Sequence, residues 1–153
     1  MVADPKSADA IEDELERVTE RQRAFERQLE TALAVDPAGL GTMAHLLREG
    51  DATPTELARR LGISTAAMTL VLDRLQAAGH VSRRPHPSDR RKVLVIPAER
   101  SARTAEELVD PLLRGIRAVT EALGADERAA VSRFLADVVA VYDRALSTGR
   151  PDR

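Results

Sequence analysis

Residues 53–95 read TPTELARRLGISTAAMTLVLDRLQAAGHVSRRPHPSDRRKVLV, and this stretch decides the fold. It opens with the strongest local start signal of the chain. Thr53 is a capping residue, Pro54 suits the first helical position, and Glu56 follows the cap at the spacing that lets its carboxylate reach back to the cap N–H. We therefore predict a short helix that begins after Thr53 and ends at Gly62, a residue that tolerates positive φ.

A second helix and a hairpin follow within the same stretch. Ser64 is the expected cap of this helix, and Gly79 is its expected end. The basic loop at 83–92, which contains two prolines, and the β-branched run at 93–96 predict a hairpin. Two short helices joined by a glycine turn, with a hairpin behind them, form a helix-turn-helix unit. The apolar stripe of the second helix consists of Met68, Val71, Leu72 and Leu75.

The charge of the chain is distributed unevenly. The formal net charge is −2, which by itself does not favour nucleic acid as a partner. Residues 52–103, however, carry ten basic and four acidic side chains, a balance of +6, and the remaining segments sum to −8. A basic loop alone is as consistent with a solvated turn as with binding. Its position beside a helix-turn-helix favours contact with DNA.

Long helices are predicted on both sides of this unit. Apolar residues at 11–33 recur at alternating spacings of four and three, which indicates a helix with an a/d seam that is interrupted by Gln22. The seam favours dimerisation, and packing within the chain is the alternative. After Pro97 the pattern is helical again, and Pro111 predicts a kink or break near Asp110. The residues assigned to the dimer contact are Ile11, Leu15, Val18, Gln22, Val138 and Tyr142.

Composition argues against several classes of function. The chain has no cysteine, which excludes disulfide scaffolds, thiolate zinc sites and cysteine nucleophiles. His45, His80 and His86 are widely spaced and form no metal-binding motif. Neither a glycine-rich phosphate loop nor a Ser-His-Asp set is present. We expect no catalytic residues, no metal, no cofactor and no enzymatic activity.

The N-terminal sequence MVADPKSADAIEDE is polar and acidic, whereas a secretory signal has a basic flank and an apolar stretch. No apolar run approaches the ~20 residues that span a bilayer. A cytoplasmic protein without a membrane partner is therefore expected.

Residues 53–95 resemble the winged helix-turn-helix of the MarR family of bacterial transcriptional regulators. Each motif alone is weak, but their order and spacing together are specific. The resemblance implies a homodimer that binds double-stranded DNA and dimerises through its terminal helices. The motifs are A-x-x-x-G-x-S (Ala58, Gly62, Ser64), D-R-L-x-x-x-G (73–79) and D-R-R (89–91).

The resemblance assigns DNA contacts to three places. The second helix would meet base edges or thymine methyls, the start of the first helix would meet phosphates, and the wing would enter the minor groove with Arg90 or Arg91. Asp89 corresponds to the aspartate that orients the wing by pairing with an arginine. Because Ala67 and Leu70 replace the polar side chains frequent in the family, we expect thymine-methyl contacts and DNA shape to contribute more. The assigned residues are Thr53, Thr55, Arg59, Ser64, Thr65, Ala66, Thr69, Leu70, Arg74, Arg83, Arg84, His86, Ser88, Asp89, Arg90, Arg91 and Lys92.

The sequence as a whole predicts one domain over residues 1–153, all-α with a small β-wing. The winged helix-turn-helix occupies 37–97, between dimerisation helices at 8–35 and 98–147. The predicted function is a homodimeric, sequence-specific transcriptional regulator, in particular a repressor of a pseudo-palindromic operator. His45 marks a candidate pocket for a small-molecule effector, and the sequence leaves open whether one is used. The alternative is a dimeric interaction module whose winged helix contacts protein.

Overall fold

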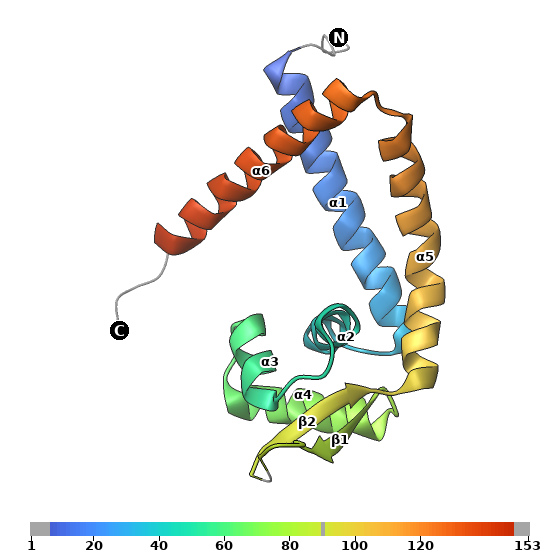
Figure 1. Ribbon diagram of the computed structural model, residues 1–153, viewed down its shortest axis with the longest axis vertical. Helices are drawn as coiled ribbons and strands as arrows, with labels where there is room; N and C mark the ends of the chain where they lie inside the picture. The colour runs from blue at the N-terminus through green and yellow to red at the C-terminus, as the bar shows by residue number, and fades with distance from the viewer. Residues whose placement is uncertain (1–6, 90, 149–153) are drawn as a thin grey trace. The chain divides into compact units, whose positions relative to one another are not determined.

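The computed structural model describes residues 7–89 and 91–148. These residues form six α-helices and one two-stranded antiparallel sheet (Figure 1), which confirms the prediction of a mostly helical fold with a small β-wing. The elements are α1 (Ala8–Leu33), α2 (Pro37–Glu49), α3 (Pro54–Leu61), α4 (Thr65–Ala77), β1 (Val81–Pro85), β2 (Val93–Pro97), α5 (Glu99–Ala122) and α6 (Ala125–Thr148).

The chain divides into two compact units inside α5. Unit 1 extends to Leu108 and holds α1 to α4, the hairpin and the first part of α5; unit 2 begins at Val109 and holds the rest of α5 and α6. The core of unit 1 lies where α2, α3 and α4 meet the hairpin. Its largest fully buried side chains are Leu46, Leu57, Met68, Leu72 and Val95, together with the hydroxyl-bearing Thr42. All four residues of the predicted α4 stripe are buried.

The first four helices each begin at a side chain that accepts a hydrogen bond from a backbone N–H of the first turn. This arrangement satisfies donors that a helix start otherwise leaves unpaired. The predicted caps at Thr53 and Ser64 are confirmed. Gly62, at the predicted turn, has a φ of 68°, and Gly79, at the predicted end of the second helix, has a φ of 77°. The four capping residues are Ser7, Asp36, Thr53 and Ser64.

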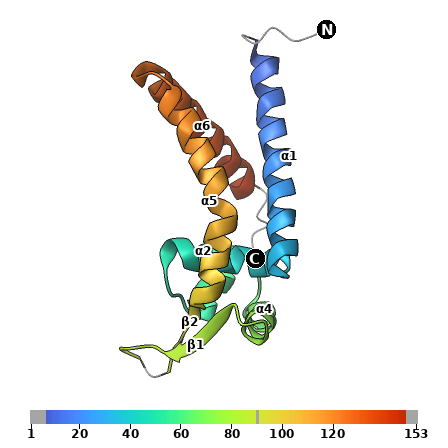
Figure 2. The same cartoon turned by 90° about the vertical axis from the view of Figure 1, so that its right-hand side faces the viewer.

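Strands β1 and β2 form a hairpin that extends away from α4 (Figure 2). Its register pairs Val81 with Pro97 at the base and Pro85 with Val93 toward the tip. The segment before α3 adds a short bridge: the Ala52 N–H donates to the Val95 carbonyl (3.3 Å), and the Val95 N–H donates to the Ala52 carbonyl (2.8 Å). The hairpin is therefore attached by backbone hydrogen bonds to the segment that leads into α3.

Of the kink or break predicted near Asp110, the break is ruled out, because α5 runs without interruption through Pro111. Proline removes one backbone hydrogen bond from a helix without necessarily ending it. Asp110 and Arg114, one turn apart around the proline, form an ion pair that suits a continuous helix. Glu107 carries the carbonyl to which an N–H at position 111 would have donated. Because Glu107 is exposed, water has access to this turn of the helix.

The apolar seam of α1 has two different surroundings. Leu29 and Leu33 at the C-terminal end are buried, and Leu33 belongs to the core of unit 1. Toward the N-terminus, Ile11 and Val18 are 44% and 62% exposed. Packing within the chain thus accounts for the end of the seam and leaves the other end uncovered. Of the remaining residues assigned to the dimer, Leu15 and Val138 are half-buried and Gln22 and Tyr142 are exposed.

Candidate nucleic-acid interface

Helix α3 begins with a capping box formed by Thr53 and Glu56, and the neighbouring Thr55 carries a free hydroxyl within the described residues. Thr53 donates its N–H (2.8 Å) and its hydroxyl (2.7 Å) to Oε2 of Glu56, and its Oγ1 accepts the Glu56 N–H (3.3 Å). The Thr53 hydroxyl hydrogen is therefore used within the cap. Thr55 is exposed and makes no side-chain hydrogen bond within the described part of the chain. Thr55 and the exposed Arg59 offer donors that a phosphate could accept.

The Glu56 carboxylate marks where α3 and the wing approach each other. The hydrogen bond from the Thr53 N–H lowers the pKa of Glu56, the bond from the Thr53 hydroxyl lowers it further, and the positive charges of Arg59 and Lys92 contribute smaller effects in the same direction. Lys92 lies on the hairpin side, so its charge acts on the start of α3. The two elements therefore share one electrostatic environment.

The solvent face of α4 carries small and apolar side chains. Thr65, Ala66, Thr69 and Leu70 are all exposed, and Leu70 is 64% exposed. Ser64 is used as the helix cap and accepts the Ala67 N–H (3.1 Å). The opposite face of α4 is buried in the core, which fixes which side of the helix remains available to a partner.

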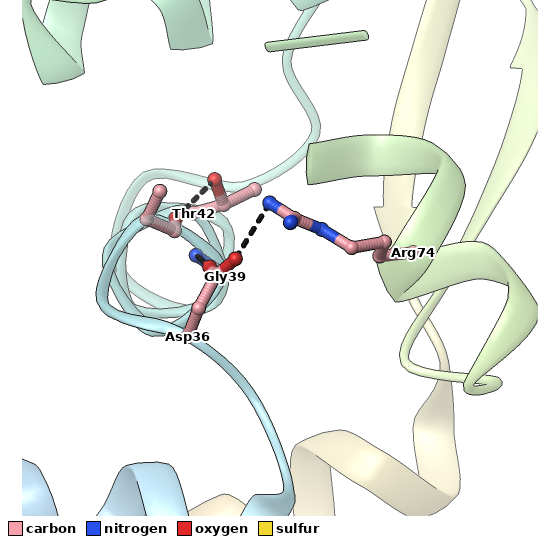
Figure 3. Close-up of polar contacts among 5 residues, drawn as sticks. Asp36, Gly39, Thr42 and Arg74 are labelled. Carbon is pink, nitrogen blue, oxygen red and sulfur yellow. Dashed lines mark hydrogen bonds and ion pairs between the residues drawn. The ribbon is translucent and has the colours of Figure 1, made fainter. Parts of the chain in front are cut away.

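Arg74, at the end of α4, is held by the residue that begins α2. Its Nη2 donates to Oδ2 of Asp36 at 2.6 Å, while Oδ1 of Asp36 accepts the Gly39 N–H at 2.7 Å (Figure 3). One carboxylate thus caps α2 and pairs with α4. The resemblance assigns Arg74 to DNA, and the structure pairs it with Asp36 within the chain. The cap was readable from the Asp36-Pro37 dipeptide, but the ion pair depends on the tertiary fold.

Arg83 connects the wing to α4. Its Nη2 donates to Oδ1 of Asp73 at 2.7 Å. Asp73 and Arg74, adjacent in sequence, therefore pair in two directions, one with β1 and the other with the start of α2. These pairs engage the charged side chains of α4 within the chain and fix the C-terminal end of the helix to its neighbours.

The wing tip is ordered by hydrogen bonds of its own. The His86 N–H donates to the Lys92 carbonyl (3.0 Å), and the Lys92 N–H donates to the Asp89 carbonyl (2.9 Å). Oδ1 of Asp89 accepts the Arg91 N–H (3.0 Å), and Nδ1 of His86 accepts the Ser88 N–H (3.3 Å). Asp89 therefore shapes the loop through a backbone N–H of its neighbour. Arg90 lies outside the described residues.

Three cations of the wing have free charged ends. The side chains of Arg84, Arg91 and Lys92 are exposed and form no ion pair within the described residues. The hairpin contacts both α3 and α4, and these two helices contact each other. The structure therefore brings together three of the predicted groups on one unit: the start of α3, the solvent face of α4 and the basic wing.

His45 is not one of these groups, but the hollow that it lines is shared with Glu56 and Arg59 of α3. His45 lines an open hollow of about 610 Å³ between α2 and α3 whose other lining residues are mostly charged. No group of three or more histidine, aspartate or glutamate side chains in the described part of the chain is placed to hold a metal ion. No helix within that part is long and apolar enough to cross a membrane. The other residues lining the hollow are Glu49, Asp51, Ala52, Glu56, Arg59 and Arg60.

Part of the chain is similar in sequence to known proteins. Residues 35–93 match the model of the MarR family. The chain is 35% identical over 88 residues to the uncharacterized HTH-type transcriptional regulator YcgE of Bacillus subtilis, which covers 58% of this chain and 57% of the relative. It is 35% identical over 88 residues to the multiple antibiotic resistance protein MarR of Escherichia coli, covering 57% of this chain and 61% of that protein. The chain thus spans somewhat more than half the length of these relatives.

A solved structure extends the likeness beyond the aligned sequence. The crystal structure of wild-type MarR from Escherichia coli in its apo form is similar at a TM-score of 0.59 and 27% identity, covering 81% of this chain and 93% of that one. The Bacillus subtilis relative is named as a transcriptional regulator, in agreement with the prediction of a regulator rather than an enzyme. The motifs of residues 53–95, the winged helix into which they fold and the matched segment 35–93 all agree in their similarity to the MarR family.

Proposed function

We propose that this protein is a transcriptional repressor that binds a pseudo-palindromic DNA duplex as a homodimer in the cytoplasm. The observation that carries the proposal is the group of three wing cations, Arg84, Arg91 and Lys92, which form no ion pair within the described residues and accompany an α4 face that is exposed to solvent. Cations neutralise phosphates independently of sequence, while a helix in the major groove reads base edges. The unit offers both kinds of contact.

Ion pairs within the chain distinguish arginines that hold the fold together from those that are available to DNA. Arg74 and Arg83 are engaged by Asp36 and Asp73, and these pairs hold α4 to its neighbours. Arg84 alternates with Arg83 on the same strand and has no such partner within the described residues. One arginine of this pair therefore positions the wing and the other is available to a phosphate.

The homodimer is proposed from apolar surface that one chain leaves uncovered. Along α6, none of the described side chains at 125–147 is buried, and several large apolar ones are at least 39% exposed. Such a stretch resembles an interface more than a solvated helix face. Two copies related by a two-fold axis would present two recognition helices to half-sites about 10 bp apart. The exposed apolar residues of α6 are Val131, Phe134, Leu135, Val139, Val141, Tyr142 and Leu146.

Control by a small molecule is the further part of the proposal. A ligand shifts a dimer between two geometries only if it binds one of them more tightly. The hollow beside His45 is the proposed location, and its charged lining suits a polar ligand. A ligand that raises the melting temperature of the protein and loses this effect in His45→Ala would support the site. A ligand that raises the melting temperature of the unmodified protein and of His45→Ala equally would show that it binds at another site.

Footprinting on the DNA upstream of the protein's own gene tests the proposed function. We expect protection of two half-sites of opposite orientation, with centres about one helical turn apart. Protection of a single half-site would contradict the homodimer. If neither this DNA nor any duplex from a random-sequence library is bound at low salt, the repressor function is wrong.

A further inference from the structure

The solvent face of α4 presents methyl groups where many DNA-reading helices present hydrogen-bonding side chains. We infer that this protein reads the C5-methyl groups of thymines in the major groove, with Leu70 as the residue that determines specificity. The inference rests on the proposed DNA-binding function and states which chemical feature of the duplex that function recognises.

Leu70 is the most exposed of the large apolar side chains of the winged helix. It is 64% exposed, and among residues 37–89 and 91–97 the other exposed one is Val93, at 40%, on the wing. The neighbouring apolar residues of the same helix, Met68, Val71 and Leu72, are at most 4% exposed. The packing of unit 1 therefore does not use Leu70, and its side chain costs solubility without contributing to the core.

Some of the polar groups on this face are engaged within the chain, whereas the Thr65 hydroxyl makes no hydrogen bond within the described residues. The Thr69 hydroxyl donates to the Thr65 carbonyl (2.9 Å), which uses its hydrogen, and the side chain is exposed. Ser64 is occupied by the helix cap. Arg74, the only basic residue of α4, donates to Asp36, and Asp73 accepts from Arg83.

The exposed apolar groups of α4 form a continuous stripe along the helix. Ala66 and Leu70 lie four residues apart, so their side chains are neighbours on one face, and Thr65 and Thr69 form the adjacent row. Among base edges in the major groove, the thymine C5-methyl is the apolar feature. A stripe of methyl and isobutyl groups therefore matches thymines, whereas guanine is usually read by arginine or lysine and adenine by asparagine or glutamine.

The experiment uses a duplex that the unmodified protein enriches from a random-sequence library. Each thymine of a half-site is replaced in turn by deoxyuridine, which removes the methyl group and keeps the base-pairing edge. Affinity is measured by fluorescence anisotropy at one fixed salt concentration. We expect at least one replacement per half-site to weaken binding about fourfold, the amount that one buried methyl group contributes.

Two variants then assign the effect to a residue. In Leu70→Ala, the enriched duplex should bind more weakly, and deoxyuridine at the sensitive thymine should cause no further loss. Gln76→Ala is the matched control, because Gln76 is an exposed amide on the same helix and should leave the deoxyuridine effect intact. Because Leu70 is exposed, its replacement is expected to leave folding unchanged, which thermal unfolding verifies.

The outcomes separate this inference from the proposed function. Salt-dependent binding of an enriched duplex with no deoxyuridine effect at any thymine would overturn the methyl readout and leave DNA binding standing. A deoxyuridine effect that persists unchanged in Leu70→Ala would overturn the assignment to Leu70. Failure to bind any duplex would overturn the proposed function and this inference with it.

Discussion

The Glu56 carboxylate closes the start of α3 by accepting two hydrogen bonds from Thr53, and these bonds hold its pKa below its ordinary value. A carboxylate with a lowered pKa stabilises the folded chain above the pKa it has when unfolded. This contribution is lost as the pH falls through the folded pKa. We therefore expect Glu56→Ala to destabilise the protein at neutral pH and to differ less from the unmodified protein as the solution becomes more acidic.

Urea unfolding from pH 7 to pH 3 measures this difference. Glu49→Ala is the matched control, because Glu49 is an exposed glutamate near the end of α2 and makes no hydrogen bond or ion pair within the described residues. Its effect on stability should be small and should depend little on pH. A difference between Glu56→Ala and the unmodified protein that stays constant over this range would contradict the role of the ionised carboxylate.

At the residue scale, the sequence was informative wherever the controlling contact is local. Thr53, Ser64 and Gly62 act within their own helix ends, so spacing alone identified them. The partners of Arg74 and Arg83 come from other elements, and a sequence pattern does not show which cations will be paired. The assignment of all wing and α4 cations to DNA therefore could not separate the two paired arginines from the free ones.

At the scale of elements, Asp36 joins the start of α2 to the end of α4, and its two roles can be separated. Asparagine is also a good capping residue, so Asp36→Asn should keep the hydrogen bond from Gly39 and lose the ion pair with Arg74. Exposed ion pairs contribute about 0.2–1 kcal/mol, and loss of a cap costs about 1 kcal/mol more. We expect Asp36→Ala to be less stable than Asp36→Asn by about the value of the cap.

Urea unfolding of both variants, with Arg74→Met as the third, checks this separation. Asp36→Asn and Arg74→Met should lower the free energy of unfolding by similar amounts. The double variant that combines Asp36→Asn with Arg74→Met should be little less stable than either single variant. Equal stability of Asp36→Ala and Asp36→Asn would show that the side chain contributes no cap. Additive losses in the double variant would show that Asp36 and Arg74 do not interact.

The helix order and the hairpin were predictable because caps, apolar periodicity and a β-branched run define them locally. Pro111 was not, because a proline inside a helical pattern permits either a break or a continuous helix. The bridge between Ala52 and Val95 also had no sequence signal, since it joins a segment before α3 to the second strand of the wing. A tertiary contact decided this second case.

At the scale of the whole molecule, the uncovered apolar surface of α6 predicts association. Leu135 and Val139, spaced one turn apart, are 48% and 57% exposed in one chain. The pair of substitutions Leu135→Glu and Val139→Glu should shift the protein from dimer to monomer in sedimentation velocity, because two buried charges at an interface are costly. Asp137→Ala, also exposed on α6, is the control and should remain dimeric.

The monomeric variant also has a consequence for DNA. Its affinity for a duplex with two half-sites should fall toward that for a single half-site, because the second contact is no longer linked to the first. A variant that is monomeric and binds the full duplex as tightly as the unmodified protein would contradict the two-fold arrangement. An unmodified protein that sediments as a monomer at micromolar concentration would contradict the homodimer itself.

The uneven charge of the chain bears most directly on the central claim, that the winged helix binds DNA through its basic wing. A net charge of −2 conceals a basic middle segment, and within the described residues the structure pairs Arg74, Arg83 and Arg103 of that segment with carboxylates. The basic segment could be predicted from the sequence, because counting charges requires no knowledge of the fold. That Arg83 pairs with Asp73 while Arg84 forms no ion pair within the described residues is evident only from the structure.

The salt dependence of duplex affinity tests this claim most directly. The logarithm of the association constant should fall linearly with the logarithm of salt concentration, with a slope of about −0.9 for each neutralised phosphate. Replacing Arg84, Arg91 and Lys92 by alanine should make this slope shallower by about 2–3. The control removes three charges from α1, Arg21, Arg23 and Arg27, all exposed, and should keep the original slope. Equal flattening in the control, or affinity that does not change with salt, would contradict the account.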